Sequence, residues 1–128
     1  MTRSPRPLIV LLLFVLGGSD RAPRGSRPNA VQTGRTPQFE NEEVKVWKSV
    51  IMPNSPLPPH RHEHPRVLTA LVGGTMRIVE QDGSSETHEW QSGKSYWLPA
   101  NRPGTLHTDV NAGDKAIEVM VVELKKAH

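Results

Sequence analysis

The chain has 128 residues, enough for one domain with a single hydrophobic core. Its formal charge of +3 is unevenly spread, because residues 1–37 contain six arginines and one acidic residue, whereas residues 38–128 contain ten basic and twelve acidic residues. Nucleic-acid binding requires a basic patch on the folded domain, so this distribution argues against that class of function. The chain has no cysteine, which excludes a disulfide, a thiol nucleophile and a lipid-attachment cysteine.

The first residues have the pattern of a secretory signal peptide. Two arginines within the first six residues precede an apolar run over 8–16, and small residues follow at 17–19. An apolar run of this length is too short to cross a bilayer, which needs about 20 residues, so we predict no stable membrane insertion. We therefore expect residues 1–19 to be a signal peptide, cut near 19–22, and the protein to be secreted or periplasmic. A start codon assigned too far upstream would instead give a cytoplasmic protein.

The next segment has the composition of a disordered arm. Residues 20–38 are rich in proline, glycine, arginine and serine and contain almost no apolar residues. We therefore expect the folded domain to span residues 39–128, beginning near Phe39.

Strand and turn patterns alternate through the rest of the chain. Apolar residues occupy even positions from Val44 to Met52, an alternation typical of a half-buried strand. Gly73-Gly74 separates two strand-like segments and predicts a two-residue hairpin between them, and Asp82-Gly83 marks the next turn. Turn signals recur about every ten residues and no segment has a helical period, so the sequence predicts an all-β sandwich or barrel.

Three of the six histidines lie in one five-residue stretch, at His60, His62 and His64. Alternate residues of a strand share one face, so two such imidazoles can aim at one point, an arrangement that suits Zn, Fe, Cu, Ni or Mn. A third ligand must come from elsewhere in the chain, and His107 is the candidate because it begins a later strand. The alternative is an exposed histidine-rich loop without a function.

These residues form two motifs that resemble those of the cupin superfamily. His60-x-His62, followed eleven residues later by Gly73, resembles the first cupin motif. A second segment, from Gly93 through Pro99 to His107, resembles the second motif, although it carries three extra residues at 101–103. The resemblance covers residues 39–125. Within the superfamily it is closest to the small single-domain cupins labelled β-alanine degradation proteins, whose core is similar to residues 58–74.

The resemblance implies a single-domain jelly-roll β-barrel with one divalent transition metal at its mouth, and a homodimer. Carried over by position, the metal ligands are His60, His62 and His107. The glutamate of the first motif is absent, because its place falls on Arg66 or Val67, neither of which binds a metal. The missing carboxylate leaves the ligand set open to three interpretations.

In the first interpretation, three histidines hold the ion alone, as in the dioxygenases of this superfamily that also lack the carboxylate. The uncompensated +2 charge of the metal then favours an anionic substrate, and Arg66 would bind the carboxylate of that substrate through two hydrogen bonds. In the second, His64 or Glu63 supplies a ligand, although Pro65 favours a place for His64 at the rim. In the third, the site has no metal and binds a small acid without catalysis, because an inward arginine close to a dication is costly.

Other residues offer weaker signals. Asp109 lies two residues after His107 on the same strand face, where it can orient an imidazole or pair with Arg66. The tryptophans and Tyr96 are expected in packing positions, with at least one aromatic ring lining a pocket. His88 alternates with charged residues and is expected outside the barrel, and Glu123 is expected on a solvated face. The catalytic residues and the substrate are not identified by the sequence.

Overall fold

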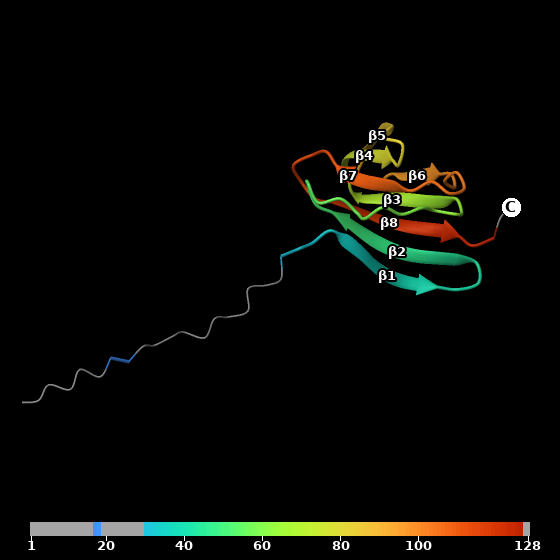
Figure 1. Ribbon diagram of the computed structural model, residues 1–128. Coiled ribbons are helices and arrows are strands. Elements are labelled where there is room, and N and C mark those ends of the chain that lie inside the picture. The colour runs from blue at the N-terminus through green and yellow to red at the C-terminus, as the bar shows by residue number, and fades with distance from the viewer. Residues whose placement is uncertain (1–16, 19–29, 127–128) are drawn as a thin grey trace, which may run out of the picture.

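The computed structural model describes residues 17–18 and 30–126, and residues 34–124 form two antiparallel β-sheets (Figure 1). In chain order the strands are β1 (Gly34–Glu40), β2 (Val44–Ile51), β3 (Arg66–Val72), β4 (Gly74–Glu80), β5 (Ser85–Trp90), β6 (Ser95–Leu98), β7 (His107–Asn111) and β8 (Ile117–Leu124). One sheet has the order β1-β2-β8-β3-β6 and the other β5-β4-β7. The predicted all-β jelly roll is confirmed. Among the residues described, no helix is long and apolar enough to cross a lipid bilayer.

The core fills the space between the two sheets. Its buried side chains come from β2, β3, β4, β5, β8 and one loop: Trp47, Ile51, Leu57, Leu68, Ala70, Met76, Trp90, Ile117, Val119 and Val121. On β2 the residues of the core cluster are the odd-numbered Trp47 and Ile51. Of the even-numbered valines, Val46 is buried outside that cluster, and Val44 and Val50 are only half-buried. The strand is therefore half-buried as predicted, and its odd-numbered face meets the core because burying the large indole of Trp47 removes more apolar surface from water.

Gly73 and Gly74 do not form the predicted hairpin. They join β3 to β4, which belong to different sheets and share no ladder. A Cβ on Gly73 would lie 2.1 Å from the carbonyl oxygen of Trp90, and one on Gly74 would lie 2.8 Å from Ile117 Cγ1. The glycines are therefore required for close approach where the chain crosses between sheets. The turn at Asp82-Gly83, by contrast, joins the paired strands β4 and β5 as predicted, with a φ of 88° at Gly83.

The folded domain begins earlier than the expected boundary near Phe39. Residues 34–38, which we placed in the disordered arm, belong to β1 and pair with β2, with Arg35 opposite Ser49 and Pro37 opposite Trp47. An edge strand can be held by main-chain hydrogen bonds without apolar side chains of its own, so its composition resembled that of an arm. The predicted signal peptide lies outside the described residues except for residues 17–18.

Candidate metal centre

The backbone brings the two histidine motifs together. His60 and His62 lie in the segment between β2 and β3, and His107 begins β7. The backbone N–H of His60 donates to the carbonyl oxygen of His107 at 2.9 Å, and the reciprocal hydrogen bond is 2.8 Å long. Only His60 makes a β-bridge here, so the strand expected to carry both histidines is replaced by an extended loop held against β7.

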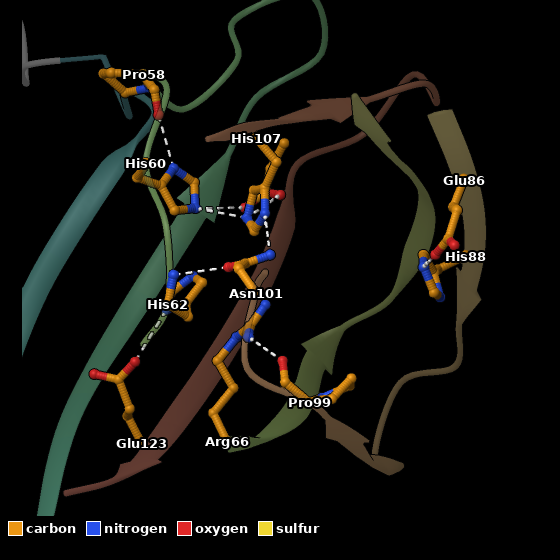
Figure 2. A network of polar contacts seen from close by, with 11 residues as sticks. Pro58, His60, His62, Arg66, Glu86, His88, Pro99, Asn101, His107 and Glu123 are labelled. Atoms are coloured by element: carbon orange, nitrogen blue, oxygen red, sulfur yellow. Dashed lines mark hydrogen bonds and ion pairs between the residues drawn. The ribbon is translucent and has the colours of Figure 1, made fainter. Parts of the chain in front are cut away.

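The three predicted histidines converge on one point. His60, His62 and His107 each offer a ring nitrogen, and these atoms lie within 4.8 Å of one another. Figure 2 shows His60 and His107 facing each other, with 3.1 Å between their Nε2 atoms. Three convergent imidazoles can bind a divalent transition metal. The fourth candidate, His64, is partly buried and lies outside this group.

His60 and His62 have the proton positions that metal binding requires. The Nδ1 of His60 lies 2.7 Å from the carbonyl oxygen of Pro58, so it carries the proton and donates. The Nδ1 of His62 lies 3.2 Å from a carboxylate oxygen of Glu123 and donates likewise. Each ring therefore keeps an unprotonated Nε2 for a metal, which is the arrangement that acceptors behind ligating histidines usually enforce.

His107 has a different neighbour on its Nδ1. Asn101 accepts a 2.7 Å hydrogen bond from the backbone N–H of His62 through Oδ1, and this bond fixes the orientation of the amide. Its Nδ2 then donates to Nδ1 of His107 at 2.9 Å (Figure 2). In this arrangement the proton of neutral His107 lies on Nε2, which points at His60. Asn101 is one of the three residues inserted into the second motif, and sequence reasoning did not assign it a role.

Burial keeps the imidazoles of His62 and His107 neutral. Burial lowers the pKa of His62 despite its hydrogen bond to Glu123, and lowers that of His107 to about 4 despite the negative charge of Asp109. Both rings are therefore unprotonated near pH 7, the form that binds a metal. The donor set thus fits a divalent ion, with a proton shift needed at His107.

Arg66 points into the barrel. Only 6% of its surface is exposed, and one guanidinium nitrogen donates to the carbonyl oxygen of Pro99 at 3.2 Å. Burial lowers its pKa to about 10, while the charges of Asp109 and Glu123 oppose this shift, so the guanidinium stays charged near pH 7. Its only hydrogen bond within the described residues goes to Pro99 and none goes to the histidines, so Arg66 does not close the metal position.

Two cavities adjoin the histidines. A cavity of about 620 Å³ is lined by Arg66, Asn101 and His107 on one side and by Glu86 and His88 of β5 on another. Its volume lies in the range of small-molecule sites, about 300–1,000 Å³. A second cavity of about 20 Å³ lies deeper, among residues that include His62, Arg66, Asp109, Trp47 and Trp90. It has room for about one water molecule or one ligand oxygen.

Three expectations about surrounding residues were wrong. Glu123 faces His62 with 16% of its side chain exposed, although it was expected on a solvated face. His88 shares a face of β5 with buried Trp90 and lines the large cavity, on the far side from the histidine cluster (Figure 2). Trp97 is 59% exposed rather than packed. Strand polarity misled for Glu123 and His88, because a barrel that encloses a polar site turns inward polar residues that the sequence alone assigns to the surface.

Comparisons with known proteins identify the fold. Neither a family model nor a curated protein matches the chain. A solved cupin domain from Bordetella pertussis Tohama I is similar, with a TM-score of 0.64 and 27% identity over 74% of this chain and 95% of that one. An RmlC-like cupin with a double-stranded β-helix fold from Methanocaldococcus jannaschii has a TM-score of 0.58 and 17% identity, covering 77% and 84%. The chain has the cupin fold.

A third solved structure widens the comparison. The polyketide cyclase RemF from Streptomyces resistomycificus has a TM-score of 0.54 and 21% identity, covering 80% of this chain and 71% of that one. The narrower likeness to β-alanine degradation proteins receives no support from these three structures. The comparisons therefore establish the fold and leave the chemistry to the geometry of the site.

Proposed function

We propose that this protein is a small exported cupin that binds one divalent transition metal through His60, His62 and His107 and acts on a small carboxylate-bearing molecule. The observation that carries the proposal is the convergence of three ring nitrogens within 4.8 Å, two of them with acceptors behind their other nitrogen. Fe, Mn, Ni, Cu and Zn all accept such ligands. The ion would supply Lewis-acid or dioxygenase-like, O₂-dependent chemistry.

Arg66 would hold the carboxylate of the substrate. Its buried guanidinium lines both the 620 Å³ cavity and the smaller cavity beside the histidines. Among the described residues, the buried side-chain nitrogens without a hydrogen-bond partner are the indole nitrogens of Trp47 and Trp90, and both indoles line the same small cavity. A buried donor without an acceptor is costly, so these groups favour a ligand or water that brings oxygen atoms.

Metal binding is the direct test. The mature protein, stripped with a chelator and reloaded, is expected to bind close to one ion per chain by calorimetry and elemental analysis. His107→Ala should abolish binding because it removes a convergent ligand, whereas the matched control His64→Ala should bind as the parent does. A stripped parent that binds none of Fe, Mn, Ni, Cu or Zn would refute the metal proposal.

The anion site is tested separately from the metal. Small mono- and dicarboxylates are titrated into the metal-loaded parent and into Arg66→Lys and Arg66→Met. Arg66→Lys keeps the positive charge but loses the planar fork, so binding should weaken, and Arg66→Met should lose it almost completely. Equal affinity in all three proteins would remove Arg66 from the ligand site.

The second candidate function is a metal-free binding protein for small acids. The observation that favours it is the 3.1 Å contact between the Nε2 atoms of His60 and His107. Through this contact, hydrogen bonds run without a break from Pro58 through the two histidines to Asn101, so no ion is needed to join the rings. Carboxylate binding that is unchanged by a chelator, in a protein that takes up no metal, would select this function over the first.

Export and dimerisation are further predictions of the proposal. Amino-terminal sequencing of protein recovered from the periplasm or culture medium is expected to show cleavage near residues 19–22. Light scattering of the mature protein checks the homodimer.

A further inference from the structure

We propose that Asp109 supplies an anionic fourth ligand to the metal centre and replaces the glutamate that the first motif lacks. The inference rests on the proposed metal-binding function. It concerns a residue of β7, whereas the missing glutamate would have stood at the start of β3, where Arg66 now lies.

The distances from Asp109 to two of the three histidines are close to those of a shared coordination sphere. Asp109 Oδ2 lies 3.4 Å from His60 Nε2, and Oδ1 lies 3.6 Å from His107 Nε2. The two Nε2 atoms are 3.1 Å apart. Two ligand atoms bound at about 2.1 Å around a tetrahedral metal are about 3.4 Å apart. The carboxylate and these two rings therefore need only small adjustments to bind one ion, whereas Asp109 must move to join the group of three ring nitrogens, to which it does not belong in this structure.

This point has more acceptors than protons. Without a metal, the Nε2 of His60 accepts the hydrogen bond from the Nε2–H of His107 at 3.1 Å. The carboxylate of Asp109 faces the same two nitrogens at 3.4 and 3.6 Å, so one proton serves two acceptors. A metal ion in place of that proton can bind both nitrogens and the carboxylate.

Asp109 has no other close charged partner among the described residues. Its side chain is 16% exposed, and its only ion-pair contacts within 4.0 Å are with His60 and His107. Arg66 influences Asp109 through its charge but makes no ion pair with it at that distance. The strand holds the residue in place, because Leu57 donates a backbone hydrogen bond to the carbonyl oxygen of Asp109 at 3.2 Å. A largely buried carboxylate directed only at candidate metal ligands is suited to ligation.

The test uses Co²⁺ as a spectroscopic probe. The chain has no cysteine, so a thiolate signal can come only from a cysteine that is introduced. Asp109→Cys places a thiolate where we infer a ligand, and a thiolate bound to Co²⁺ adds an intense charge-transfer band in the near ultraviolet. The control Glu118→Cys places a thiol on β8 outside the site, where Glu118 pairs with Lys48. Asp109→Asn measures the loss of affinity by competition with a chromogenic chelator.

We expect the charge-transfer band in Asp109→Cys and not in Glu118→Cys. Asp109→Asn should lower the Co²⁺ affinity by about 100-fold or more, which exceeds the usual effect of losing a residue that only hydrogen-bonds to a metal ligand. Asp109→Cys that shows the visible bands of bound Co²⁺ without the charge-transfer band would overturn the inference. If Asp109→Cys does not fold or does not bind Co²⁺, Asp109→Asn decides the question. Unchanged Co²⁺ affinity in Asp109→Asn would overturn the inference, and a loss of affinity in a folded Asp109→Asn protein would support it. If the parent itself binds no metal, the proposed function fails instead.

Discussion

The buried histidines His62 and His107 are the same side chain in two different settings. His62 is supported by an acceptor, the carboxylate of Glu123, whereas His107 faces a donor, the amide of Asn101. Both are buried and both have lowered pKa values. The difference shows that His60 and His62 already have the tautomer that binds a metal ion, with the proton on Nδ1. His107 has the other tautomer, which suits the metal-free state. Binding must therefore displace a proton from His107 and reorganise Asn101.

The largest expected effect is the pH dependence of stability in the chelator-treated protein. In the folded protein the pKa of His107 is about 4, below the ordinary value of 6.5. Between these two pH values the unfolded state binds a proton at His107 and the folded state does not. The free energy of unfolding should fall as pH drops from about 6.5 to about 4, by about 3 kcal/mol from this group. Urea denaturation across this range measures it, and His107→Gln should flatten the slope. An unchanged slope in that variant would assign the effect to other groups.

The next effect concerns the acceptor behind His62. Glu123→Gln keeps the size of the side chain but weakens the acceptor, and its amide can also present a donor to Nδ1. We expect metal affinity to fall by about 10- to 100-fold, the usual range when a residue that hydrogen-bonds to a metal ligand is replaced. Calorimetric titration with Zn²⁺ measures it, and Glu118→Gln, on the same strand but paired with Lys48 outside the site, is the matched control. Equal affinity in the two variants would show that the Glu123 contact does not tune His62.

The smallest effect should be a gain. Asn101→Asp gives both the backbone N–H of His62 and Nδ1 of His107 an acceptor, so His107 can carry its proton on Nδ1 and offer Nε2 to the metal. We expect tighter Zn²⁺ binding by about tenfold, the lower end of the range for outer partners. Arg102→Gln, one residue away, lowers the net charge by the same one unit and is the control. Weaker binding in Asn101→Asp than in this control would contradict the tautomer argument.

Sequence reasoning was strongest where a local pattern carries the information. Turn residues such as Asp82-Gly83 and the alternation of short apolar segments predicted the all-β fold, and motif spacing selected His60, His62 and His107 out of six histidines. It was weakest where a residue's surroundings come from distant strands. The core face of β2 depended on Trp47 pairing with β8 and joining the core cluster, and the crossing at Gly73 depended on the backbone at Trp90.

The sequence by itself determined the type of chemistry available: a barrel of short strands, three histidines with motif spacing, and an arginine where a glutamate would be expected. Only the tertiary structure decided what surrounds them. Glu123, Asn101 and Asp109 reach the histidines from β8, an inserted loop and β7, across separations in sequence that no local period records. Charge and tautomer at the site depend on which atoms lie within about 3 Å of each nitrogen, and that is set by how the sheets and loops pack together.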